Sequence, residues 1–362
     1  MDKKQLRAGV IGCGAISDIY LKNMKNKFDN LEVVSCAARH LESAQKKAQQ
    51  YGIKGCTVDE LLADESIDMA VILTPAPTHY ELIKKALEAG KHVYTEKTIT
   101  ITPETAKELL ELADAKGLYL GSAPDTFLGA SWQTARKLID EGTLGEITSF
   151  QISANRDLDL LTSMFGFLRM PGGGICYDYG VYYLTALVSL LGPAARVSAI
   201  VKNPKPVRVN IMPQSPEYGK EFSYPNESQV AAVLELESGV TGNFALNGDS
   251  VIADQAQFLI YGTKGILKLT DPNQFGGKNM LLANSYDFAN PPVWTEVENV
   301  FAHAENSRGI GPSEMAAAIL SGDKNRASKE MAYHVLDVID TMMKSSESGR
   351  FEEVASTCGR PE

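Results

Sequence analysis

Short apolar runs alternate with helix-like segments over the first third of the chain. Uninterrupted apolar runs predict strands that are buried on both faces, as in parallel sheets. These runs cover residues 8–11, 32–38, 69–73, 92–95 and 118–121. Helices are expected between them at residues 41–50, 80–89 and 103–115, each followed by a glycine that can end a helix. This alternation predicts an α/β fold: a doubly wound parallel sheet of the Rossmann type.

The pattern changes after about residue 122. Helices are expected at 131–141, 177–191, 314–320 and 329–344, and hairpins at 231–246 and 258–270, with turns at 238–239 and 262–265. Strands grouped apart from helices predict an α+β domain with a large, mainly antiparallel sheet. We therefore expect a Rossmann domain over 1–122 and an α+β domain over 123–362. The Pro- and Asn-rich stretch 203–226 is interpreted as an excursion or lid.

Composition narrows the class of protein. The chain has 362 residues, 44% of them apolar, and a formal net charge of −10. An acidic surface repels phosphate backbones, which disfavours nucleic acids and anionic membranes as partners. The N-terminus has no signal-peptide pattern, and no apolar run approaches the roughly 18–20 residues of a membrane span. We expect a cytoplasmic protein.

Cysteine and histidine spacing gives no sign of a metal. The five cysteines are scattered without a CxxC pair, so buried free thiols are expected. The histidines at 40, 79, 92, 303 and 334 form no ligand-spaced cluster. We predict no metal site.

The motif GVIGCGAIS follows the first predicted strand and precedes a helix. Gly12 permits a tight turn there, and Gly14 lets the backbone approach a pyrophosphate. Ala15 and Ile16 lead into the helix, whose first N–H groups and dipole favour an anion. Ser17 stands where the third glycine of GxGxxG is usual. The loop predicts dinucleotide binding.

The end of the second strand bears on the choice between NAD and NADP. NAD-binding folds usually place a carboxylate there, which accepts hydrogen bonds from the ribose 2′-hydroxyl. This chain has Cys36-Ala37-Ala38-Arg39-His40 instead. Arg39 can attract a 2′-phosphate that a carboxylate would repel. NADP is therefore the predicted cofactor, with NAD as the alternative.

Several segments together resemble the Gfo/Idh/MocA family along nearly the whole chain. They are GVIGCGAIS, ILTPAPTHYELIKKALEAGKHVYTEK, GTLGEI, GGGICYDYGVYYL and YGTKGIL. The AARHL stretch around Arg39 is similar to the NADP-using dihydrodiol dehydrogenase branch. The resemblance implies an oxidoreductase with a Rossmann domain and a β-rich substrate domain. It also implies a homodimer or homotetramer assembled through the C-terminal sheet.

The resemblance assigns roles to residues after the fourth and third predicted strands of the Rossmann domain. The family's catalytic lysine matches Lys97 in Glu96-Lys97-Thr98, and both Glu96 and Lys97 are expected beside the cofactor. Thr74, Pro75 and His79 are expected near the nicotinamide ribose. Thr98 replaces the family's proline, and a non-proline residue costs roughly 2.5–4 kcal/mol to hold in the cis form. We therefore expect a trans Lys97–Thr98 bond.

A second set of candidates lies in the predicted substrate domain. Asp178 and Tyr182 stand four residues apart and would share one helix face. The resemblance gives Tyr182 the general acid or base position, where most family members carry histidine, and gives Asp178 the orientation of substrate hydroxyls. Asp125 and Arg156 are further substrate-binding candidates. Each of these side chains could also have a purely structural role.

These expectations converge on hydride transfer between NAD(P) and a secondary alcohol or ketone of a sugar, cyclitol or related polyol. Lys97 and Tyr182 would handle the proton. Two alternatives stay open. One is an NAD-dependent glycoside hydrolase of the same family, and the other is a non-catalytic dinucleotide-binding regulatory protein.

Overall fold

The computed structural model describes residues 5–251, 256–284 and 289–362. The chain forms two compact units. One contains the residues up to Asp125 together with Asn306–Tyr333 and Pro361–Glu362, and the other contains Thr126–Glu305 and His334–Arg360. The break after Asp125 lies three residues beyond the boundary expected at 122. The return of Asn306–Tyr333 to the first unit was not indicated by the hydrophobic pattern.

A six-stranded parallel sheet forms the core of the first unit, in the order β3-β2-β1-β4-β5-β6. Its strands are β1 (Leu6–Ile11), β2 (Leu31–Ala37), β3 (Lys54–Cys56), β4 (Met69–Ile72), β5 (His92–Thr95) and β6 (Leu120–Ser122). The strand order reverses between β1 and β4, which is the Rossmann arrangement. The predicted doubly wound fold is confirmed. Only β3 was missed, because its three residues carry no apolar run.

Helices cover both faces of this sheet. They are α1 (Ser17–Asn26), α2 (Leu41–Tyr51), α3 (Val58–Ala63), α4 (His79–Glu88), α5 (Pro103–Lys116) and α9 (Ile310–Ser321). Local sequence sets their ends. α2 and α5 stop at Gly52 and Gly117, whose φ angles are 63° and 64°, and the Thr102 side chain caps α5 by accepting a hydrogen bond from Thr105 N–H.

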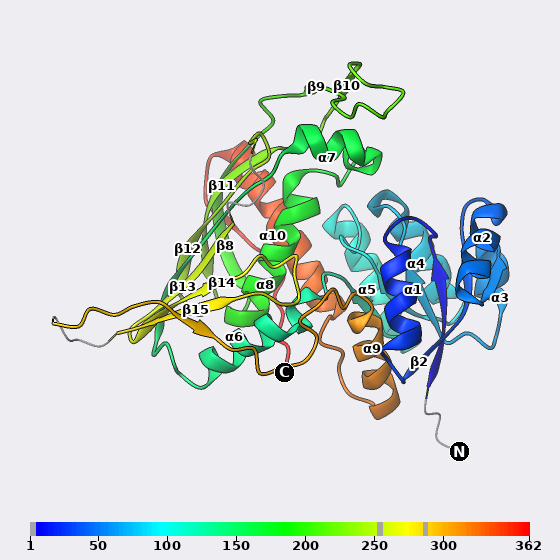
Figure 1. Cartoon of the computed structure of the whole chain (residues 1–362), viewed down its shortest axis with the longest axis horizontal. Coiled ribbons are helices and arrows are strands. Elements are labelled where there is room, and N and C mark those ends of the chain that lie inside the picture. Colours follow the sequence, from blue (N-terminus) through cyan, green and yellow to red (C-terminus); the bar gives the residue numbers. More distant parts are fainter. Residues whose placement is uncertain (1–4, 252–255, 285–288) are drawn as a thin grey trace. The chain divides into compact units, whose positions relative to one another are not determined.

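Helix α9 explains why the chain returns to the first unit. Right-handed crossovers put α1 and α2 on one face of the sheet and the later helices on the other. On the face that carries α1, these helices leave β5 and β6 uncovered. α9 packs against α1, β5 and β6, and Figure 1 shows it beside α1. The approach is close: a Cβ on Gly311 would lie 2.1 Å from the Tyr94 hydroxyl oxygen.

A nine-stranded sheet dominates the second unit, in the order β16-β15-β14-β13-β7-β12-β11-β8-β17. Every neighbouring pair is antiparallel except β7 and β12. Its strands are β7 (Ile147–Asn155), β8 (Ala194–Lys202), β11 (Gln229–Leu236), β12 (Thr241–Asn247), β13 (Gln257–Gly262), β14 (Gly265–Leu269), β15 (Asn279–Ala283), β16 (Thr295–Val297) and β17 (Glu352–Glu353). The expected large, mainly antiparallel sheet is confirmed.

One face of this sheet is covered by helices and the other is open. Figure 1 draws α6 (Ala130–Asp140), α8 (Val181–Leu191) and α10 (Lys329–Ser348) on the same face. The burial of β11 alternates accordingly: Val230 and Leu234 are buried, whereas Ala231 and Val233 are exposed. The period of two fits a sheet that buries a single face.

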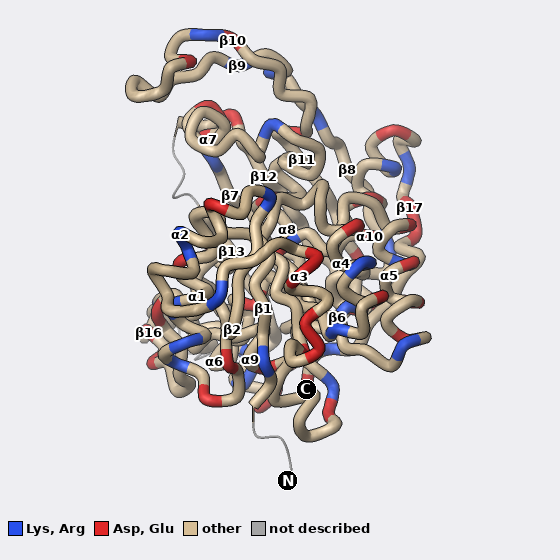
Figure 2. The backbone as a smooth tube through the Cα atoms, turned by 90° about the vertical axis from the view of Figure 1, so that its right-hand side faces the viewer, with Lys and Arg blue, Asp and Glu red and all other residues tan. Residues whose placement is uncertain are grey.

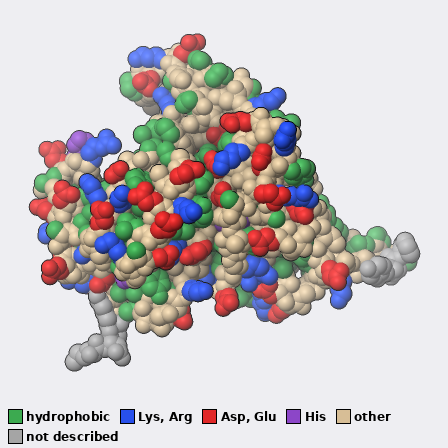
Figure 3. Space-filling model, turned by 180° about the vertical axis from the view of Figure 1, so that it is seen from behind, with side chains coloured by type: hydrophobic (Ala, Val, Ile, Leu, Met, Phe, Trp, Pro, Cys, Tyr) green, Lys and Arg blue, Asp and Glu red, His purple; other side chains and the backbone are tan. Residues whose placement is uncertain are grey.

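Charged side chains of both signs are interspersed. Figure 2 shows basic and acidic positions close together along α4 and α5, where Lys84 pairs with Glu108 at 2.7 Å. Figure 3 shows the same mixture on the face that it draws. Among the helices of residues 5–251, 256–284 and 289–362, none has the length and apolarity needed to cross a membrane.

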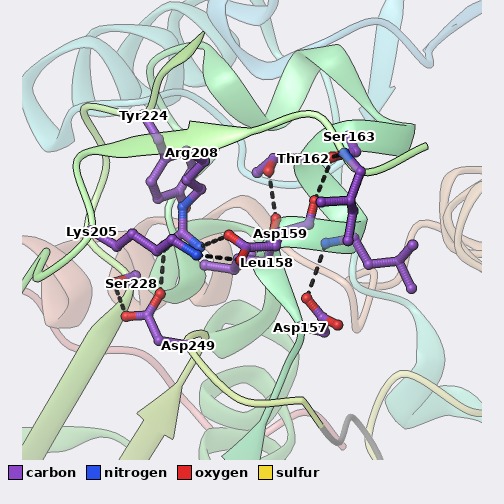
Figure 4. A network of polar contacts seen from close by, with 12 residues as sticks. Asp157, Leu158, Asp159, Thr162, Ser163, Lys205, Arg208, Tyr224, Ser228 and Asp249 are labelled. Carbon is purple, nitrogen blue, oxygen red and sulfur yellow. Dashed lines mark hydrogen bonds and ion pairs between the residues drawn. The ribbon is translucent and has the colours of Figure 1, made fainter. Parts of the chain in front are cut away.

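The excursion at 203–226 contains two short strands, β9 (Val207–Val209) and β10 (Glu221–Ser223), which pair only with each other. Arg208 anchors it, and its side chain is completely buried. The guanidinium binds Asp159 of α7 (Leu158–Met164) at 2.8 Å and Asp249 at 2.6 Å, as Figure 4 shows. It also lies 4.6 Å from the Tyr224 ring.

We predict that Arg208→Met lowers the free energy of unfolding of this unit by about 3 kcal/mol, because two carboxylates lose their shared cation. Urea titration measures the free energy of unfolding. Limited proteolysis within residues 203–226 should also become faster, because this segment loses its anchor. Lys205→Met is the matched control: Lys205 also binds Asp159 but is 47% exposed, so its loss should cost less than about 1 kcal/mol. Equal effects of the two substitutions would contradict the assignment.

Candidate functional site

The glycine loop between β1 and α1 is built by close backbone packing. Gly12 has a φ of 112°, and its N–H donates to the carbonyl of Ala37 at 2.8 Å. A Cβ on Gly12 would lie 2.8 Å from the main-chain carbon of Leu73. Both the backbone angle and the contact exclude a side chain here. Gly12 therefore shapes the loop from within.

The outer part of the loop has room for a phosphate group. Gly14 and Ala15 are exposed, and nothing lies within 4 Å of a Cβ built on Gly14. Within the described ranges, no residue accepts a hydrogen bond from the main-chain N–H of Gly14, Ala15 or Ile16. Free donors at a helix start fit an anion such as a pyrophosphate. Ser17, in place of the third glycine, is buried and donates to the Gly14 carbonyl at 2.6 Å.

The predicted cofactor residues of the first unit gather at one edge of the sheet. Parallel pairing aligns the strand ends, so β1, β2, β4 and β5 all finish along that edge. Arg39 follows β2 and is exposed. Thr74 and the exposed Pro75 follow β4, and Glu96 and the half-buried Lys97 follow β5. The structure thus brings these five side chains to the edge that carries the glycine loop.

His79, at the start of α4, links two of these strand ends. It is fully buried, and its Nδ1 and Nε2 lie 2.7 Å from the carbonyl oxygens of Thr98 and Thr74 respectively. Burial lowers the pKa of His79, and the two carbonyl partners oppose that shift. His79 holds the segments that carry Thr74 and Lys97. Its predicted contact with the nicotinamide ribose stays a prediction.

Glu96 fixes the main chain beside Lys97. One carboxylate oxygen accepts the Tyr20 hydroxyl at 2.7 Å, and the other accepts the N–H of Lys97 at 3.1 Å. The Lys97–Thr98 peptide bond is cis, so the trans bond expected from the loss of the family's proline was wrong. The conformation is held by the surrounding contacts: Glu96 binds the N–H before this bond, and His79 binds the carbonyl after it.

Asp125 lies beyond β6 and inside the first unit. It is 2% exposed, and its carboxylate accepts the N–H of Gly311 in the first turn of α9 at 3.0 Å. Burial raises the pKa of Asp125 to about 6, and the bond from Gly311 and the charge of Arg308 oppose the shift. This contact supports the position of α9. The predicted role of Asp125 in substrate binding is not addressed by it.

Asp178 and Tyr182 belong to the second unit. The predicted helix at 177–191 is confirmed from Val181 onward, but a π-helical turn, Cys176–Gly180, precedes it. Asp178 lies half-buried in that turn, and Tyr182 is 8% exposed in the first turn of α8. π-helical turns are rare and frequently occur at functional sites. The aliphatic residues of α8 from Val181 to Leu190 are buried, and Leu191 is half-buried.

Arg156 lies at the end of β7 and packs on an aromatic ring. Its guanidinium carbon is 3.7 Å from the centre of the Tyr179 ring. The Tyr179 hydroxyl donates to Asp271 at 2.9 Å and lies 2.9 Å from the Tyr183 hydroxyl. A stacked guanidinium is held in place by this contact. The structure thus places Arg156 in a polar network near the start of α8.

Two residues of these sites were missed by the sequence analysis. Tyr20, on α1, is buried and binds Glu96. Glu227 precedes β11, and its carboxylate accepts the N–H of Cys176 at 2.9 Å. Helical periodicity predicts Tyr20 only as a core residue of α1. The residues next to Glu227 in the sequence form no motif that would indicate a functional role. The signal for Glu227 lies in another segment. Gly174 is a glycine because a Cβ at that position would overlap the Glu227 carboxylate.

The five cysteines are free thiols that differ in burial. Cys36, Cys56 and Cys176 are buried free thiols as expected, whereas Cys13 and Cys358 are half-buried. Among the residues that the structure describes, no group of three or more His, Cys, Asp or Glu side chains could hold a metal ion.

The fold and the glycine loop define a Rossmann protein with a dinucleotide site at the carboxyl edge of its sheet. Residues 6–123 match the model of the oxidoreductase family with an NAD-binding Rossmann fold, and residues 132–268 match the GFO/IDH/MocA C-terminal domain. The chain belongs to the Gfo/Idh/MocA family. The resemblance inferred from the sequence motifs is confirmed.

Relatives and solved structures agree with this placement. An uncharacterized oxidoreductase of Schizosaccharomyces pombe is 34% identical over 54% of this chain and 54% of its own length. The scyllo-inositol 2-dehydrogenase (NADP(+)) of Bacillus subtilis is 25% identical over 71% of this chain and 66% of its own length. The match to the yeast relative thus spans about half of that protein. Levoglucosan dehydrogenase in complex with NADH and L-sorbose shares the fold, with a TM-score of 0.85 at 19% identity over 97% of this chain and 99% of that one.

We predict opposite effects for two neighbouring glycine substitutions. Gly14→Ala should leave the stability of the fold within about 0.5 kcal/mol of wild type, because its Cβ meets no atom within 4 Å. It should weaken dinucleotide binding at least tenfold, because the methyl group enters the space beside the free N–H groups. Fluorescence titration with the reduced dinucleotide measures the affinity.

Gly12→Ala is the matched comparison. It should destabilise the first unit by roughly 1–3 kcal/mol, because alanine would be strained at this φ and would clash with Leu73. If Gly14→Ala unfolds the protein instead, or leaves affinity unchanged, the phosphate site is misplaced.

Proposed function

We propose that this protein catalyses reversible hydride transfer between NADP(H) and a secondary alcohol or ketone of a sugar, cyclitol or related polyol. The observation that carries this proposal is the pairing of two features at one sheet edge. One is the glycine loop with its free N–H groups, and the other is the Lys97 segment, fixed by Glu96 and His79. The names of the inositol and levoglucosan dehydrogenases support a polyol or sugar as substrate.

The residues divide the work according to their chemistry. The nicotinamide ring, when bound, supplies the hydride acceptor or donor. In the oxidation direction, we assign Tyr182 the role of general base for the proton of the substrate hydroxyl, and Lys97 the role of orienting that hydroxyl. Asp178 accepts hydrogen bonds from neighbouring substrate hydroxyls. Loss of the hydride and the proton from one carbinol leaves the ketone, so the reaction balances.

A homodimer or homotetramer is part of the proposal. The nine-stranded sheet has one face without helices, and Ile200 of β8 and Val233 of β11 are 60% and 49% exposed there. They lie on neighbouring strands near the β17 end of the sheet, where β11 pairs with β8. Covering this face with a second copy would remove the exposed apolar side chains from water.

We predict that NADP⁺ is reduced in the presence of at least one member of a panel of sugars and inositols, as followed at the nicotinamide absorbance. Lys97→Ala and Tyr182→Phe should each lower kcat by about 10²–10⁴-fold, the usual size of a general acid–base contribution. Dinucleotide affinity should stay within about threefold. Lys84→Ala, which removes a half-buried lysine of α4 that pairs with Glu108, is the matched control.

The same assay separates the alternatives. Product formed without stoichiometric NADPH would indicate the glycoside hydrolase that retains its cofactor. Dinucleotide binding with no turnover of any panel member would indicate the regulatory protein. Turnover that is unaffected by Lys97→Ala would contradict the mechanism.

Cofactor choice is tested by Arg39→Ala. A charge-assisted hydrogen bond contributes about 1.5–3 kcal/mol, so the affinity for NADP should fall at least tenfold when Arg39 no longer meets the 2′-phosphate. The affinity for NAD, which lacks that phosphate, should change less than about threefold. Isothermal titration with both dinucleotides measures this, and an equal loss for the two cofactors would contradict a role in 2′-phosphate recognition.

A further inference from the structure

Glu227 connects the excursion at 203–226 to the main sheet of the second unit. It stands between β10 and β11 and directly follows Asn226, whose side chain donates to the carbonyls of Leu168 and Met170 at 3.0 and 2.9 Å. The Tyr224 hydroxyl donates to the carbonyl oxygens of Gly173 and Glu227 at 3.2 and 3.3 Å. These contacts of the neighbouring residues and of the Glu227 main chain hold Glu227 against the glycine segment 172–174.

Both ends of Glu227 bind the start of the π-helical turn. Its main-chain carbonyl accepts the N–H of Ile175 at 3.0 Å, and its carboxylate accepts the N–H of Cys176 at 2.9 Å. These are donors at a helix start, which lack partners within the helix. A carboxylate at this position is also favoured by the helix dipole.

The glycine motif fits this contact. A Cβ on Gly174 would lie 1.9 and 2.0 Å from the two carboxylate oxygens of Glu227. A Cβ on Gly173 would lie 2.2 Å from the carbonyl oxygen of Leu168. Gly173 and Gly174 are thus required within the unit by its own packing. Gly174 makes room for a carboxylate.

The turn that Glu227 binds carries the two candidate catalytic side chains. Asp178 lies within Cys176–Gly180, and its N–H donates to the carbonyl of Gly174 at 2.8 Å. Tyr182 follows one turn later on α8. A rotation or shift at Cys176 would move both side chains together, and misplacement by about 1 Å can cost roughly 10²-fold in rate.

We infer that Glu227 is a positioning residue for Asp178 and Tyr182: its carboxylate, seated against Gly174, fixes the start of the π-helical turn that carries them. This inference rests on the proposed function for its kinetic consequence. Its structural part, that the carboxylate orders residues 175–182, can be measured independently of turnover.

The ionisation state of Glu227 gives the inference a pH signature. Burial raises the pKa of Glu227 to about 7, and the N–H groups of Cys176 and Tyr177 oppose that shift. Cys176, Tyr177 and Tyr224 interact with Glu227. The groups that in turn act on Tyr177 and Tyr224 are Asp340 of α10, Asp178 of the π-helical turn, and Arg208 and Asp249 around the excursion. Burial raises the pKa values of Cys176, Tyr177 and Tyr224, so these three are neutral at pH 7.

The test compares wild type with Glu227→Gln in the polyol oxidation assay between pH 5.5 and 9. In wild type, kcat should rise as pH increases through about 7, because the ionised carboxylate is the stronger acceptor for the turn. In Glu227→Gln, kcat should be about tenfold lower above pH 7.5 and should lack this step. Dinucleotide affinity should be unchanged. Gly174→Ala, which displaces the carboxylate by contact, should lower kcat in the same way.

Stability supplies a second readout with a defined sign. The folded pKa of Glu227, about 7, lies above the ordinary pKa of a glutamate, 4.5, so the folded state binds more protons between these values and stability falls as pH rises through that window. Glu227→Gln removes this dependence. The Tm of Glu227→Gln relative to wild type should therefore increase from pH 5.5 to 8. Glu221→Gln, an exposed carboxylate on β10, is the matched control.

The outcomes separate the inference from the proposed function. If wild type oxidises a polyol and Glu227→Gln keeps both its kcat and its pH step, the inference is wrong and the function stands. If no polyol is oxidised, the proposed function is wrong. Amide hydrogen exchange of residues 175–182 then decides: several-fold faster exchange in Glu227→Gln at pH 7.5 supports the positioning role, and unchanged exchange overturns it.

Discussion

A parallel sheet buried on both faces can present functional groups only at the ends of its strands. In the first unit, apolar strands are covered by α1, α2 and α9 on one face and by the remaining helices on the other. The loops that leave the carboxyl ends of β1, β2, β4 and β5 are consequently forced along one edge. Gly12, Arg39, Thr74 and Lys97 meet there for that reason, although 85 residues separate the first from the last.

Two buried polar side chains hold the main chain at this edge in place. His79 and Glu96 use their polar atoms on main-chain groups around Lys97 and on Tyr20. Burying such groups is costly unless every donor and acceptor is satisfied. Here His79 and Glu96 have such partners, and these contacts fix the segment that carries Lys97. A preorganised site of this kind loses little freedom on binding.

The sequence was sufficient for those features that depend on local pattern. Apolar runs located β1, β2, β4, β5 and β6, glycines marked the ends of α2 and α5, and GVIGCGAIS located the anion loop. Features that depend on distant packing were not predictable in this way. The return of α9 follows from a bare patch over β5 and β6, which exists only once the sheet is assembled. The cis bond between Lys97 and Thr98 was likewise not predicted from the sequence.

Asp125 and Glu227 show one solution to the same problem in both units. Each carboxyl is enclosed, which raises its pKa, to about 6 for Asp125 and about 7 for Glu227. Each receives a main-chain N–H from a helix start, Gly311 of α9 and Cys176 of the π-helical turn. Apolar isosteres could fill these spaces, but they could not satisfy the unpaired donors of the first helical turn. An enclosed acid therefore does what packing alone cannot: it fixes the rotation of the helix that it caps, and with it every side chain that the helix carries.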